Sequence, residues 1–149
     1  MLLNLFRKTA VSPFDEDKIV KAIREAESGT RAEIRVHIAK KSKGRDTLSL
    51  AIETFHKIGM TETEEKNGVL IFVIPGERKF AIIGDSGIHS HVTDEFWTMV
   101  KGEMQTLFLN GDLTGAIQHG IHRAGEKLSQ YFPANNINPN ELSDEISLG

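Results

Sequence analysis

Two carboxylates, Asp85 and Asp94, flank a short polar stretch that opens with Gly84-Asp-Ser-Gly87 and closes with Thr93-Asp-Glu95. Calcium and magnesium ions bind several oxygen ligands, and an irregular loop can supply them from carboxylates and backbone carbonyls together. We therefore expect a divalent-cation site, for calcium or magnesium, with Asp85 and Asp94 as its ligands. In the alternative reading both have structural roles: Asp94 stabilises the positive end of a helix and Asp85 holds a turn.

Hydrolysis of a phosphate ester is a second chemistry that these residues suggest. The chain has no cysteine, so a metal ion on Asp85 and Asp94 would have to activate water in place of a cysteine nucleophile. Arg78 would then be the anion-binding residue that orients the phosphate. The chain contains none of the motifs Asp-x-Asp-x-Thr, Arg-His-Gly or Gly-x-x-x-x-Gly-Lys. A weak metal-dependent acid phosphatase therefore stays an alternative.

Histidines suggest two further sites, each with a simpler reading. In an extended segment, His89 and His91 would face the same side and could hold zinc with Asp85, although exposed loop histidines are the commoner case. Glu33, Arg35 and His37 alternate along one segment and could pair as acid and base. Charges that alternate on a half-covered strand usually meet water or pair across strands, which we expect here.

Three segments have strand patterns. The unbroken apolar run Val69 to Ile74 predicts a central strand that is covered on both faces. The turn residues Pro75 to Arg78 lead into a second apolar run, Lys79 to Ile83, and together they predict a β-hairpin. Ala32 to Ala39 alternates between apolar and polar residues, which predicts a strand near an edge with one wetter face.

Four segments have the apolar periodicity of helices. Their start and stop signals place them from Ser12-Pro13 to Gly29, from Asp46 to Gly59, from Thr93 to Asn110-Gly111, and from Leu113 to Phe132. The order of elements is thus α, β, α, β, β, α, α. It predicts a three-layer α/β/α sandwich around a small mixed sheet, made of a parallel βαβ unit and an antiparallel hairpin strand, with helices on both faces.

The whole sequence of 149 residues fits one domain. We expect an N-terminal segment at 1–11, the domain at 12–132 and a polar, flexible tail at 133–149. The net charge is −3 and no basic stripe is visible, which argues against nucleic-acid binding. No signal peptide or membrane-spanning run is present, so we expect a cytoplasmic protein. The apolar residues Leu2, Leu3, Leu5 and Phe6 allow peripheral contact with a membrane or a partner.

An ordered set of motifs resembles the TPM domain. It consists of Asn67-Gly68 before an aliphatic strand, Glu77-Arg78-Lys79 at a turn, Gly84-Asp-Ser-Gly87-Ile88 followed by Thr93-Asp94, and Gly115-Ala-Ile-Gln-His-Gly120-Ile121 in a helix. The resemblance covers Ser12 to Phe132, and the chain looks like a short, stand-alone bacterial type of the domain.

The resemblance implies an α/β/α fold and several functions. Members of the family in the thylakoid lumen are linked to photosystem repair and described as acid phosphatases, others bind a divalent cation such as calcium, and animal members modulate a membrane receptor. The commoner arrangement, a signal peptide before the domain and a transmembrane segment after it, is not found in this sequence. We therefore expect a stand-alone binding or accessory module with a protein partner and a divalent cation near Asp85 and Asp94. The phosphatase and a membrane-peripheral adaptor are the alternatives.

Overall fold

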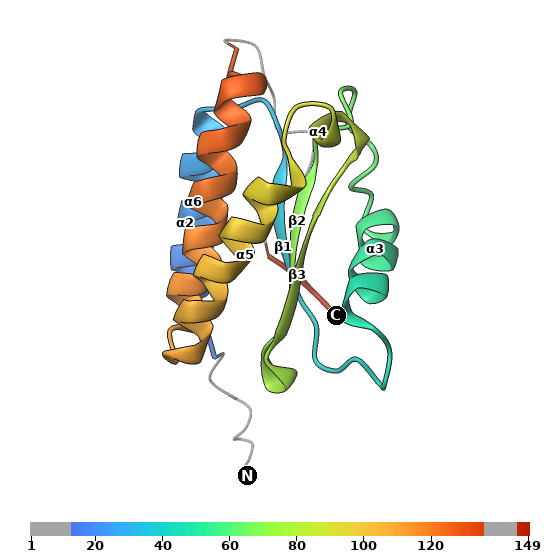
Figure 1. Cartoon of the computed structure of the whole chain (residues 1–149), viewed down its shortest axis with the longest axis vertical. Helices are drawn as coiled ribbons and strands as arrows, with labels where there is room; N and C mark the ends of the chain where they lie inside the picture. Colours follow the sequence, from blue (N-terminus) through green and yellow to red (C-terminus); the bar gives the residue numbers. More distant parts are fainter. Residues whose placement is uncertain (1–12, 136–145) are drawn as a thin grey trace.

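The computed structural model describes residues 13–135 and 146–149, and these residues form a four-stranded sheet between two layers of helices (Figure 1). The strands lie in the order β3-β2-β1-β4. Their bounds are Ile34–Ile38 for β1, Val69–Ile74 for β2, Lys79–Gly84 for β3 and Ser147–Leu148 for β4. β1 is parallel to β2 and to β4, whereas β3 is antiparallel to β2. The predicted parallel unit and hairpin strand are confirmed.

The helices lie on both faces of this sheet, as predicted. α3 covers one face alone, and α2, α5 and α6 cover the other as a group (Figure 1). The helices are α2 Glu16–Ser28, α3 Thr47–Lys57, the single turn α4 Ser86–His89, α5 Asp94–Leu109 and α6 Leu113–Tyr131. A short 3₁₀ turn, Pro75–Glu77, links β2 to β3. The α/β/α sandwich is therefore the fold of this chain.

The core is divided by β2, whose residues are all buried. Leu70, Phe72 and Ile74 pack with Phe55 of α3. The residues between them point to the other face and pack beneath α2, α5 and α6; they are Val69, Ile71 and Val73. A strand with an apolar residue at every position can bury both faces, and this explains why β2 lies inside the sheet. β1 pairs with one side of β2, and β3 pairs with the other side.

Most helix ends agree with the sequence. Asp46 and Thr93 cap α3 and α5, because their side chains accept hydrogen bonds from Ser49 N and Phe96 N. The first helix is a correction: it begins at Glu16 with Asp15 as its cap, three residues after Pro13. The Asp15 side chain accepts the N–H of Lys18, and a carboxylate is a strong N-cap, so the helix starts there.

Two turns also differ from the prediction. The positive φ of the hairpin turn, 54°, belongs to Arg78 and not to Gly76. The stretch after β3, which we read as an irregular loop, forms α4, because Asp85 caps a single helical turn.

The final residues were predicted to be a flexible tail, yet residues 147–148 form β4 beside β1. Gly149 N donates to Ile38 O at 3.0 Å, and Lys40 N donates to Gly149 O at 3.2 Å. The prediction missed this strand because it is short and polar at its start. The predicted N-terminal segment at 1–11 lies outside the described part of the chain. This segment includes the apolar residues Leu2, Leu3, Leu5 and Phe6.

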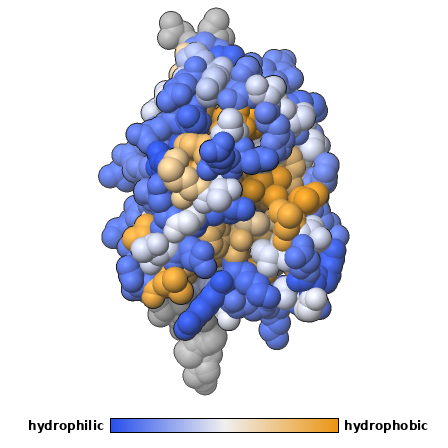
Figure 2. Space-filling model, in the orientation of Figure 1, coloured by the Kyte–Doolittle hydropathy of each residue, from blue (hydrophilic) through white to orange (hydrophobic). Residues whose placement is uncertain are grey.

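Apolar side chains gather on the face shown in Figure 2, between α5 and α3 and over β3. Most of the side chains around this strip are polar or charged, and smaller apolar patches lie to its left in the view. None of the helices in the described ranges is long and apolar enough to cross a membrane.

Candidate functional site

Asp85 lies where β3 ends and α4 begins, opposite the start of β2. Its backbone N–H donates to Gly68 O at 3.0 Å, which extends the β2–β3 pairing by one residue. Its carboxylate Oδ1 accepts the N–H of Ser86 at 2.7 Å and so caps α4. Through Oδ1, Asp85 therefore stabilises a turn, which is the structural role that the alternative reading gave it.

Gly87 brings the backbone of α4 against the segment that precedes β2. Its N–H donates to Lys66 O at 2.8 Å. A Cβ atom at this position would lie 2.1 Å from Glu65 O and 2.6 Å from Lys66 O, both of them backbone atoms. Only glycine allows so close an approach. The α4 end of the sheet thus has backbone carbonyl oxygens next to a carboxylate.

Two buried oxygen atoms at this end have no hydrogen-bond partner among the described residues. One is Oδ2 of Asp85, and the other is Oδ1 of Asn67, a residue that is 1% exposed. Buried oxygens are normally satisfied, so an unpartnered pair on neighbouring segments calls for a water molecule or a cation. Asn67 was not among the predicted ligands. Its place directly before the buried strand, in the Asn-Gly motif, is the signal that could have identified it.

Asp94 stands apart from this arrangement. It is the exposed first residue of α5, whereas Asp85 is the N-cap of the preceding turn α4. An acidic residue in the first turn stabilises the positive end of a helix, which is a sufficient role for Asp94. Within 13–135 and 146–149, no group of three or more histidine and acidic side chains is arranged to hold a metal ion. A cation at this end would therefore depend on Asp85 together with neutral oxygens.

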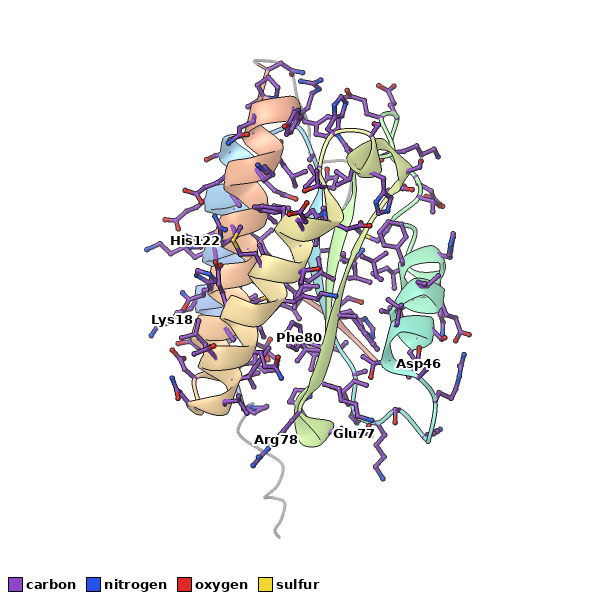
Figure 3. All side chains as sticks on the ribbon, viewed as in Figure 1. Lys18, Asp46, Glu77, Arg78, Phe80 and His122 are labelled. Carbon is purple, nitrogen blue, oxygen red and sulfur yellow. The ribbon has the colours of Figure 1, made fainter. Side chains whose placement is uncertain are left out.

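Arg78 lies at the far end of β3 from Asp85, at the tip of the hairpin (Figure 3). The strand between them spans roughly 20 Å at the usual rise per residue. Arg78 instead borders a cavity of about 280 Å³, whose apolar lining includes Phe80, Phe108 and Leu113. The expectation that Arg78 orients a phosphate beside Asp85 therefore needs correction, because one phosphate cannot reach both residues.

The histidines are explained by packing. His91 stacks on Tyr131 with ring centroids 5.1 Å apart, whereas His89 is exposed at the end of α4. His119 on α6 contacts Glu103 of α5 at 2.6 Å, and Arg123 contacts the same carboxylate at 3.0 Å. The His119 hydrogen bond, followed by that from Arg123, lowers the pKa of Glu103. This trio links two helices on the surface.

The predicted wet face of β1 is covered in the structure. Glu33 and His37 are 4% and 7% exposed. The His37 ring stacks on Phe72 at 5.6 Å, and its Nδ1 atom lies 2.8 Å from Ser147 Oγ. Burial lowers the pKa of His37, and the charges of Arg35 and Lys57 lower it further. The expected solvation is therefore wrong for Glu33 and His37, and His37 is covered by Phe72 of β2 and Ser147 of β4.

Comparison with known proteins places the chain among small α/β proteins. The structure of BA42 from Bizionia argentinensis is similar at a TM-score of 0.85 and 37% identity, over 94% of this chain and 98% of BA42. The N-terminal domain of cg2496 from Corynebacterium glutamicum has a TM-score of 0.64 at 16% identity, over 90% of this chain and 83% of that domain. An N-terminal domain from P. gingivalis has a TM-score of 0.62 at 15% identity, over 75% and 72% of the two chains.

The last two likenesses show the fold alone, because their identities are low. No curated protein matches the chain. The model of the TPM domain matches residues 7–127, which include both strands of the hairpin, α4 and most of α6. The chain therefore belongs to the TPM domain family.

Proposed function

We propose that this chain is a binding module that takes a divalent cation of the calcium or magnesium class at the α4 end of its sheet. The single observation that carries the proposal is Oδ2 of Asp85, a buried carboxylate oxygen without a hydrogen-bond partner in the described residues. A buried carboxylate is costly unless a positive charge or hydrogen-bond donors compensate it. A cation beside Asp85 would supply that charge.

The neighbouring groups favour a hard cation over zinc. Oδ1 of Asn67 is a neutral oxygen without a partner, and Gly87 lets the backbone at Glu65 and Lys66 approach closely. Calcium accepts such mixtures of carboxylate, amide and carbonyl oxygens. Zinc prefers nitrogen and sulfur ligands, but the chain has no cysteine and His91 packs against Tyr131.

A protein partner stays part of the proposal, as the role of an accessory module. We propose no phosphate site at Arg78, because β3 separates it from Asp85. The membrane-peripheral alternative depends on Leu2, Leu3, Leu5 and Phe6, which lie outside the described residues, and it stays a prediction. The cytoplasmic location likewise stays a prediction.

Calorimetric titration of the metal-free protein with calcium, magnesium and zinc tests the site. We expect calcium or magnesium to bind, and we expect Asp85→Asn to weaken that binding at least about tenfold, because the amide keeps the shape but removes the charge. Asp94→Asn is the matched control, since it removes one exposed charge at the next helix. It should change the affinity by less than about threefold.

Two readouts make the outcome clear. Trp97 is 9% exposed in the first turns of α5, so its emission reports changes at this end of the fold. Circular dichroism of Asp85→Asn shows whether the variant is folded. If folded wild-type protein binds none of the three ions, the cation proposal is wrong. If Asp94→Asn alone abolishes binding, Asp85 is the wrong ligand.

For the accessory role, wild-type protein and Asp85→Asn serve as baits in the host extract, each with calcium and with a chelator. A partner of this site should bind the wild type in calcium and be lost in the other three conditions. If the same proteins bind in all four conditions, partner binding does not depend on the cation, and this part of the proposal is wrong.

A further inference from the structure

The outer edge of β3 is open. β3 is the first strand in the order β3-β2-β1-β4, and no element of the described chain pairs with its other side. It runs between α5 and α3 with its edge free, as Figure 1 shows. At the other side of the sheet, the last strand in the order is β4, which has two residues and pairs with β1. β3 is therefore the longer edge strand of the described sheet, with six residues against two in β4.

Backbone groups along β3 point alternately inward and outward, and the hydrogen bonds show which are which. Asp85 N donates to Gly68 O, so Asp85 and its alternate neighbours point toward β2. Val69 N donates to Glu33 O, which turns Val69 toward β1 and away from its partner Gly84. By this alternation the N–H and C=O groups of Phe80, Ile82 and Gly84 point outward.

The side chains of this edge lack the usual protection. Between Lys79 and Asp85 the strand has no charged residue, no proline and no bulge. Phe80, Ile82 and Ile83 are only half-buried. Natural proteins protect open edges with charges, prolines or bulges, because a bare apolar edge pairs with another strand. An edge of this kind is suited to a partner strand.

We propose that the partner is a second copy of this chain, whose β3 pairs antiparallel with the first across a twofold axis. The two four-stranded sheets then form one continuous sheet. In such a pair, outward-pointing residues must stand opposite outward-pointing residues. Only the register centred on Ile82 opposite Ile82 of the partner subunit uses all three outward residues on each side, with Phe80 opposite Gly84 of the partner subunit.

The side chains at the ends of the strand fit this register. Lys79 comes to stand opposite Asp85 of the partner subunit, so unlike charges face each other at both ends. The Phe80 ring comes to stand across from a glycine, a pairing in which the aromatic ring covers the exposed backbone. The edge is therefore self-complementary in hydrogen bonding, in charge and in shape.

The inference does not rest on the cation, and its test is made in a chelator. Sedimentation at low to high micromolar concentration should show a concentration-dependent dimer of about twice the chain mass of 16.6 kDa. Ile82→Pro removes an N–H that points outward and leaves the pairing with β2 intact. We expect it to raise the dissociation constant at least about tenfold.

Ile82→Thr is the matched control, because it shortens the side chain but keeps the N–H, and it should leave most of the dimer. Lys79→Glu places a like charge opposite Asp85 of the partner subunit and should weaken the dimer, more strongly at low salt. Circular dichroism confirms that each variant is folded. A wild-type protein that stays monomeric at every concentration would overturn the proposal. So would a dimer that Ile82→Pro leaves unchanged in its folded form.

Discussion

The strand β1 has charged and ring side chains on one face and is covered by the last residues of its own chain. The edge strand β3 has aliphatic and aromatic side chains and is left open. His37 in β1 is 7% exposed, while Phe80 and Ile82 in β3 are only half-buried. The difference teaches that burial of a side chain on a strand depends on which segments pack around the strand more than on the residue type. A strand with polar residues on one face can lie inside the sheet, and an apolar strand can lie at its edge.

The largest expected effect concerns the ring beneath the covered edge. Phe72 is 1% exposed and stacks on His37, so Phe72→Ala leaves a cavity between β1, β2 and α3. We expect the free energy of unfolding to fall by about 3–5 kcal/mol. Chemical denaturation monitored by circular dichroism measures it. A loss below about 1 kcal/mol would show that the covered edge does not depend on this packing.

Removal of residues 146–149 makes β1 an edge strand. It deletes β4 and the hydrogen bonds of Gly149 with Ile38 and Lys40. Each bond contributes modestly after its exchange with water, so we expect a loss of about 1–3 kcal/mol. Self-association should increase, since the edge strand is then β1, which is longer than β4. Thermal unfolding measures the first effect and sedimentation the second. Unchanged stability would mean that β4 does not hold the edge.

Acid should weaken the covered edge through His37. Burial lowers its pKa below the ordinary value of 6.5, so the unfolded chain takes up a proton at a higher pH than the folded chain. This stability is present above pH 6.5 and is lost as the pH falls through the folded pKa. Its slope cannot exceed about 1.4 kcal/mol per pH unit for one group. Denaturation of wild type and His37→Phe across this range measures it, and equal slopes would contradict the prediction.

The smallest expected effect concerns the open edge in the monomer. Lys79 is exposed and its charge is only a minor cause of the lowered pKa of Glu77, so Lys79→Gln should change the stability of dilute protein by less than about 0.5 kcal/mol. Differential scanning fluorimetry at low concentration checks this. A larger loss would mean that Lys79 stabilises the fold of the monomer. The effect of a Lys79 substitution on the dimer could then not be separated from its effect on folding.

The fold was predictable where one residue pattern allowed one structure. The unbroken apolar run of β2, the Asp46 and Thr93 caps and the Asn110-Gly111 stop each depend on nearby residues. β4 was not predictable, because Ser147 and Leu148 have no pattern of their own and become a strand only beside β1. The covered face of β1 was missed for the same reason, since a distant segment covers it.

The candidate site was predictable in part. Asp85 was identified from its polar, glycine-containing surroundings, and the structure gives it a buried oxygen without a partner in the described residues. Asn67 was missed because its side chain gains significance only when β2 and β3 pair. Arg78 was grouped with Asp85 because they are close in sequence, but an extended strand carries its two ends far apart.

The sequence by itself determined the family resemblance, the order of the longer helices and strands and the layers, because periodicity, caps and turns act over a few residues. The tertiary structure alone decided that the last residues pair with β1, that oxygens of Asn67 and Asp85 are buried without partners in the described residues, and that Arg78 lies far from Asp85. These properties depend on groups that the sequence separates and the sheet brings together. The contacts between these groups stabilise the protein only after the chain has folded and excluded water from between them.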